Sequence, residues 1–108
     1  WTPETLLNIG KKEFQYKKYQ KSAQFYHALI KKFPEHQSID DRVLFEAGIA
    51  AYESKKHYQW AISHFEKLTQ KYPRSDYYRG AKLWMGLSHL HAGNKKEFLS
   101  VVEEFRKK

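Results

Sequence analysis

The chain has 108 residues, of which 20 are Lys or Arg, 12 are Asp or Glu and none is Cys. This length allows one domain with a modest core, and the lack of cysteine excludes disulfides and metal sites built on thiolates. The formal net charge of +8 draws attention to anionic partners. No apolar run approaches the ~20 residues that a membrane span requires, and no segment has the form of a secretory signal peptide.

The first predicted unit is a pair of helices within residues 3–36. Thr2-Pro3 offers an N-cap followed by proline at the first helical position, and an apolar run then ends at Gly10. A second helix has residues at the spacing i, i+4, i+7 and i+11, which marks one face of an α-helix. These residues are Ser22, Tyr26, Leu29 and Phe33. Pro34 disfavours α geometry in the residue before it, so we expect this helix to end there.

The second predicted unit, residues 37–75, repeats this order, and its apolar run ends at Gly48, 38 residues after Gly10. Ser38 and Asp41 have the spacing of a capping box that starts its first helix. The second helix has the same face as in the first unit and ends before a proline. The residues of this face are Ala61, Phe65, Leu68 and Tyr72.

The third predicted unit, residues 76–108, departs from this pattern. Ser75 can cap its first helix, Gly86 continues the spacing of 38 residues, and Gly93-Asn94 supplies the turn. The face of its second helix consists of Phe98, Val102 and Phe105. Phe98 stands where the other units have the small residues Ser22 and Ala61. We therefore expect its two helices to cross at a greater distance or in a shifted register.

A two-helix repeat of 34 to about 40 residues is the tetratricopeptide pattern, and the chain resembles this family over nearly its whole length. The resemblance implies an all-α, right-handed solenoid of three helix-turn-helix repeats with six helices. The segment 72–86 looks like a subfamily of bacterial envelope proteins that includes periplasmic TolA-binding coordinators and outer-membrane assembly lipoproteins. This likeness implies a periplasmic or envelope location, with the cytoplasm as the alternative. Because the chain opens at Trp1 without methionine and stops inside a repeat, we expect a fragment of a longer protein.

Each first helix has two apolar stripes, of which one is needed for packing within its own hairpin and on the next repeat. The second stripe recurs at Leu7, Lys11 and Phe14, at Phe45, Ile49 and Tyr52, and at Leu83, Leu87 and Leu90. The resemblance implies that these positions line a concave groove, with Arg42, Glu46, Glu53 and His91 beside it. Such a groove suits an amphipathic helix or an extended apolar peptide of another protein.

An alternative reading of this stripe is that neighbouring first helices bury it against one another and leave no ligand site. The stripe also differs from the family's clamp for the terminal carboxylate of a peptide. That clamp uses Lys and Asn at these positions, and Lys11 is the one residue of this kind here. The resemblance therefore does not imply binding of chaperone tails.

Lysine pairs recur in every turn between paired helices and form a second candidate site. They are Lys17-Lys18, Lys55-Lys56 and Lys95-Lys96. Stacked repeats bring these turns to one edge, which predicts a basic edge able to bind nucleic acid, lipid or another anionic polymer. The alternative is a set of solvated lysines that complement helix dipoles. Only four of the 20 basic residues are arginine, which disfavours nucleic acid because arginine forks supply much of its recognition.

The histidines do not form a metal site by sequence spacing. His89 and His91 point about 200° apart on a helix, and His57 and His64 are roughly 10 Å apart along one. His57, Trp60 and His64 share a face, which predicts a small contact patch on the convex side with an unusually exposed Trp60. The alternative is a tryptophan that folds flat over its own helix.

No motif of a catalytic or cofactor site is present, such as a nucleophile in a sharp turn or a Gly-rich phosphate loop. We therefore predict a protein without enzymatic activity or cofactor, which acts as a scaffold by binding another protein in the groove. A further alternative is a homo-oligomer that associates through the apolar end face around Leu99, Val102 and Phe105.

Overall fold

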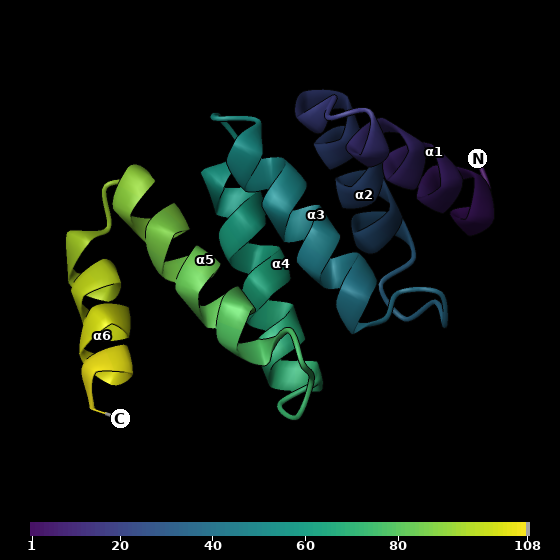
Figure 1. Ribbon diagram of the computed structural model, residues 1–108. Helices are drawn as coiled ribbons and strands as arrows, with labels where there is room; N and C mark the ends of the chain where they lie inside the picture. The colour runs from purple at the N-terminus through teal and green to yellow at the C-terminus, as the bar shows by residue number, and fades with distance from the viewer. Residues whose placement is uncertain (108) are drawn as a thin grey trace.

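The computed structural model describes residues 1–107 and consists of six α-helices in this range, with no strand. The helices are α1 (Pro3–Gln15), α2 (Tyr19–Lys32), α3 (Asp41–Glu53), α4 (Tyr58–Lys71), α5 (Tyr78–His91) and α6 (Lys95–Arg106). They form three hairpins that follow one another from the N-terminus at one end to the C-terminus at the other (Figure 1). This arrangement confirms the predicted all-α class. Lys108, the last residue of the predicted third repeat, lies outside the described residues.

The helices within residues 1–107 are 12 to 14 residues long, and none is long and apolar enough to cross a membrane. The principal extents of the molecule are 43 × 28 × 22 Å.

The start of α1 is as predicted, whereas α3 and α5 begin differently. Thr2 caps α1, because its side chain accepts a hydrogen bond from the Thr5 backbone N–H at 3.1 Å. The predicted capping box of Ser38 with Asp41 is wrong, since Asp40 is the N-cap of α3 and accepts from the Val43 N–H at 2.9 Å. The carboxylate of Asp40 lies just outside the first helical turn, where it reaches an unpaired donor.

Ser75 does not cap α5, which corrects a further prediction. The helix begins at Tyr78, so Ser75 lies too far upstream to serve as the N-cap. Its hydroxyl instead donates to Asp41 Oδ2 at 2.6 Å and accepts from the Tyr77 N–H at 2.9 Å. Ser75 therefore links the second and third hairpins at the start of α3.

Each glycine of the repeated spacing marks the place where two paired helices touch. A Cβ added to Gly48 would lie 2.4 Å from the Phe65 ring, and one added to Gly10 would lie 3.2 Å from the Tyr26 ring. Tyr26 and Phe65 are fully buried. The aromatic ring of each second helix therefore packs directly on the backbone of the first helix, which only glycine allows at this distance.

The register of the third hairpin is shifted by one residue, as the sequence had left open. Val101, and not the predicted Val102, lies over Gly86, with a Cβ-to-Cγ1 distance of 2.9 Å for an added Cβ. Val101 is buried, whereas Val102 is 36% exposed. The shift also places Glu104, three residues after Val101, at the position that leucines occupy in the other two hairpins.

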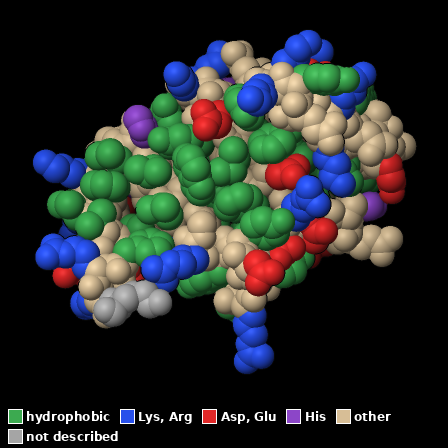
Figure 2. All heavy atoms as spheres, viewed as in Figure 1, with side chains coloured by type: hydrophobic (Ala, Val, Ile, Leu, Met, Phe, Trp, Pro, Cys, Tyr) green, Lys and Arg blue, Asp and Glu red, His purple; other side chains and the backbone are tan. Residues whose placement is uncertain are grey.

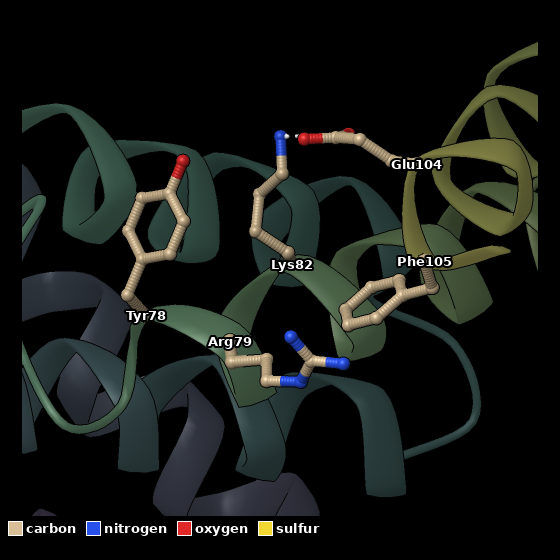
Figure 3. Close-up of a pocket in the computed structure, with 5 residues that line it drawn as sticks. All are labelled: Tyr78, Arg79, Lys82, Glu104 and Phe105. Atoms are coloured by element: carbon tan, nitrogen blue, oxygen red, sulfur yellow. Dashed lines mark ion pairs between the residues drawn. The ribbon is translucent and has the colours of Figure 1, made fainter. Parts of the chain in front are cut away.

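An ion pair consequently replaces a pair of buried leucines at the crossing of α5 and α6. In the first hairpin the equivalent positions are Leu6 and Leu29, and in the second they are Leu44 and Leu68, all buried. In the third they are Lys82 and Glu104, whose Nζ and Oε1 atoms lie 3.3 Å apart (Figure 3). Val101 is the one residue of α6 that is buried. The α5–α6 hairpin thus has the smallest apolar contact of the three.

Candidate partner-binding surface

The outer residues of the predicted groove on α3 contact the neighbouring first helix. The ring of Phe45 stacks on Tyr77 with centroids 4.8 Å apart, and a Cβ added to Gly80 would lie 3.3 Å from it. Tyr52 meets Trp84 edge-on at 4.9 Å. Much of both rings is therefore covered by α5, in the way that the alternative reading of the stripe describes.

The equivalent residues of α5 are the most exposed part of the stripe. Leu83 and Leu90 follow Phe45 and Tyr52 by 38 residues, and they are 49% and 40% exposed. In the part of the chain that the structure describes, no helix follows α6 to cover them. The stripe thus changes from a contact between repeats on α3 to a free surface on α5.

The remaining apolar positions of the predicted groove are partly covered. Leu7 and Phe14 on α1, Ile49 on α3 and Leu87 on α5 are all half-buried. Leu7, Phe14 and Ile49 pack against the main apolar core. Ile49 and Leu87 occupy the same position in successive repeats, so they connect the covered part of the stripe with Leu83 and Leu90.

Exposed apolar surface is concentrated on the third hairpin. Six large hydrophobic residues are exposed, and four of them belong to α5 and α6: Leu83, Leu90, Leu99 and Val102. Figure 2 shows hydrophobic side chains gathered over the side of the molecule where α5 and α6 lie, with Lys and Arg side chains at the border. We refer to the surface of these four residues as the end face.

The polar residues of the predicted groove gather at its opposite end, between α1 and α3. A depression of about 460 Å³ is lined there by Lys11, Phe14, Gln15, Lys17, Tyr19, Arg42 and Glu46. Glu46 accepts a hydrogen bond from the buried Tyr26 hydroxyl at 2.7 Å and pairs with Arg42 at 3.2 Å. Burial and this hydrogen bond raise the pKa of Tyr26, so its hydroxyl remains a donor. Since its one carboxylate is already paired, this end of the groove favours an acidic ligand group.

Glu53 and His91 lie beside the stripe at the end of α3 and the end of α5. Glu53 is half-buried and His91 is exposed. The imidazole of His91 stacks on Tyr58 with centroids 5.1 Å apart and meets Tyr52 edge-on at 5.5 Å. His91 therefore packs across the second and third hairpins and presents its other face to a ligand.

The predicted basic edge is correct for two hairpins and wrong for the third. Lys17 and Lys55 adopt left-handed backbone conformations, with φ of 61° and 64°, in the turns after α1 and α3. They are exposed, as are Lys18 and Lys56. Gly93, with φ of 88°, takes this position in the third hairpin, which moves Lys95-Lys96 into the first turn of α6. There the helix dipole opposes a cation, so the dipole does not explain this pair.

The predicted convex patch is a packed contact between α2 and α4. Trp60 lies between His27 and His57, with ring centroids 3.9 Å and 3.7 Å away and planes within 6° and 3° of its own. His64 is 2% exposed and lies 5.6 Å from His27. Trp60 is half-buried, and the prediction of an unusually exposed tryptophan is wrong. The sequence gave no indication of His27, because it comes from another repeat.

The ring nitrogens of this cluster are buried without polar partners. They are His27 Nδ1, His57 Nε2 and both nitrogens of His64. Burial lowers the pKa of His64 to about 3, and it also lowers the pKa values of His27 and His57. Among residues 1–107, no three His, Asp or Glu side chains converge in a way that could hold a metal ion.

A small pocket between α5 and α6 results from the shifted register. It has a volume of about 150 Å³ and is lined by Tyr78, Arg79, Lys82, Glu104 and Phe105 (Figure 3). The guanidinium of Arg79 lies 4.8 Å from the centre of the Phe105 ring. Its charged groups are already engaged with one another or with the ring, so this pocket offers no free group for catalysis.

Residues 42–75, which comprise the second hairpin, match the family model of the tetratricopeptide repeat. Repeats of this family generally mediate protein–protein interactions. No curated protein sequence matches the chain. The match covers about a third of the chain, and the equivalent glycine contacts of the flanking hairpins extend the same geometry on either side.

Proposed function

We propose that the chain is a protein-interaction scaffold without catalytic activity, which binds an apolar helix or peptide of a partner protein. One observation carries the proposal: the stripe of Ile49, Leu83, Leu87 and Leu90 leaves its most exposed leucines on α5. Burying an exposed leucine contributes about 1.5–3 kcal/mol, so a few such contacts suffice for a specific complex. Conserving solubility against this exposed surface fits a site that is covered in use.

The proposed location of this scaffold is the bacterial envelope, where it would act in assembly or maintenance. The support for this part is the likeness of segment 72–86 to envelope proteins with tetratricopeptide repeats. Expression of the parent protein with a fluorescent tag, followed by fractionation of cytoplasm, periplasm and membranes, tests the location. Recovery in the cytoplasmic fraction alone would refute it.

A pull-down from an extract of the source cell tests the interaction. The bait is the chain itself, and the groove variant is Leu83→Ser with Leu87→Ser and Leu90→Ser. Tyr16→Ser is the matched control, because Tyr16 is also an exposed hydrophobic residue but lies in the turn after α1. We expect a protein that the wild type and the control retain at high salt and that the groove variant loses. Equal retention by all three baits would refute the groove as the binding site.

The rival function is binding of an anionic polymer by the basic edge, and the net charge of +8 favours it. Its support in the structure is limited to four exposed lysines in two adjacent turns: Lys17, Lys18, Lys55 and Lys56. Such binding would weaken steeply with salt, with a log–log slope near −0.9 per phosphate neutralised on duplex DNA. Retention that disappears at high salt, equally for bait and groove variant, would move the function to this edge.

A further inference from the structure

We infer that the end face receives one amphipathic helix of the partner, which lies along α5 in the way that α5 lies along α3. The inference rests on the proposed function and specifies the partner's element, its register and its charge. The end face consists of Leu83, Leu90, Leu99 and Val102, as defined above.

The contact between α3 and α5 is the template for this complex. Phe45 lies over the bare backbone of Gly80 and against Tyr77, and Tyr52 lies against Trp84. Gly80 and Trp84 are four residues apart, so both lie on the side of α5 that faces α3. A small residue and a large apolar residue at i and i+4 are therefore the complement of this stripe.

The same complement fits the end face. Leu83 and Leu90 occupy the positions of Phe45 and Tyr52 in the next repeat and have the same spacing of seven residues. A docked helix with a small residue opposite Leu83 can approach α5 closely, and an apolar residue four positions later reaches Leu90. Val102 and Leu99 on α6 supply the second wall of the site, as α4 does for α5.

The N-terminal end of a second copy does not supply this complement. The residues of α1 that correspond to Gly80 and Trp84 are Glu4 and Asn8, and both are exposed. Stacking of copies head to tail would place the Glu4 carboxylate against Leu83, where its burial without a partner is costly. The N-terminal end of this solenoid is therefore polar, and its C-terminal end is apolar.

The charge at the end face favours an acidic partner helix. Residues 74–108 have a net charge of +4, and Glu104 is already paired with Lys82. The remaining cations of α6 are exposed: Lys95, Lys96, Arg106 and Lys107. Two copies joined end face to end face would bring these cations together, whereas Asp or Glu on the flanks of a partner helix would complement them.

A labelled helical peptide serves as the probe. Its sequence is that of residues 76–92 with Arg79→Glu and Lys82→Glu, and a hydrocarbon link between positions 83 and 87 holds the helix. Fluorescence anisotropy measures its affinity for the whole chain. We expect binding that weakens at least tenfold with Leu83→Glu or Leu90→Glu in the chain and stays unchanged with Tyr16→Glu. A peptide that displaced α5 from α3 would not depend on these two leucines, and that result would overturn the inference.

A second peptide tests the register, because Gly80→Leu places a bulky side chain opposite Leu83. We expect at least a tenfold loss of affinity. Equal binding of both peptides, with both dependent on Leu83 and Leu90, would overturn the α5-like register and leave the proposed function intact. No binding of the first peptide at 1 mM would also overturn the inference, while the pull-down decides the proposed function independently. Sedimentation of the chain alone completes the test, since a dimer abolished by Leu83→Glu would make a second copy the occupant.

Discussion

Acidification should weaken the contact between the first and second hairpins through His64. This imidazole is buried in α4 against His27 of α2, and neither of its ring nitrogens has a hydrogen-bond partner. Burial lowers the pKa of His64 from 6.5 to about 3, with smaller contributions from His27 and Lys67. The charged neighbours that act on His27 and His57 are also cationic, namely Lys31 and Lys56. Protonation of the cluster therefore meets only unfavourable charge among these neighbours.

The sign of the effect follows from which state takes up the proton. Below pH 6.5 the unfolded chain protonates His64, whereas the folded chain keeps it neutral until about pH 3. Stability is thus lost as the pH falls through this window, at a rate of up to 1.36 kcal/mol per pH unit. Between pH 7.5 and pH 5 the loss from this one residue amounts to about 2 kcal/mol, and His27 and His57 act in the same direction.

Urea unfolding followed by circular dichroism at pH 7.5 and pH 5 measures this loss. The variant His64→Leu removes the titrating group at similar volume, so its stability should fall by about 2 kcal/mol less than that of the wild type over the same range. The comparison cancels carboxylates that titrate in both proteins. An equal loss of stability in wild type and variant would refute the role of His64.

Three further predictions concern the helix crossings. The double variant Lys82→Leu with Glu104→Leu restores the leucine pair of the other hairpins and should raise the free energy of unfolding by about 1–3 kcal/mol; a less stable double variant would contradict this. Gly48→Ala should cost about 1–3 kcal/mol because its Cβ would lie 2.4 Å from Phe65, and Phe65→Leu in the same chain should recover part of it. Tyr26→Phe should cost about 1–2 kcal/mol, since it removes a hydrogen bond to a carboxylate. Urea unfolding at pH 7.5 measures all three, and unchanged midpoints would contradict the last two.

The helices and their pairing could be predicted because short-range patterns determine them. The aromatic residues that pack on Gly10 and Gly48 recur with the glycines, and the prolines after Phe33 and Tyr72 end the helices nearby. The register of α6 depends instead on contacts across the hairpin. Val101 and Val102 are adjacent and equally apolar, so no local pattern distinguishes them.

The candidate site was predictable in its residues but not in their exposure. Phe45 and Leu83 occupy the same position in successive repeats, and only the presence of a following helix makes one covered and the other free. Helix caps failed for a similar reason, because Asp40 and Asp41 are adjacent acids and the backbone geometry decides which of them caps α3. The stack of His27 on Trp60 joins residues 33 positions apart, which periodicity within a single helix cannot reveal.

The third hairpin combines two departures from the other repeats that support one function. Its α5–α6 crossing depends on an ion pair and Val101, so the attachment of α6 gains less from apolar burial than that of α2 or α4. Its outer side presents the end face, where a helix in contact with both α5 and α6 would add apolar contacts across their crossing. Binding and attachment of α6 are then coupled, because the same partner that covers Leu83 and Val102 stabilises the hairpin that positions them. A repeat with a fully apolar crossing would bind without this coupling, so the charged pair makes the order of the site depend on the partner.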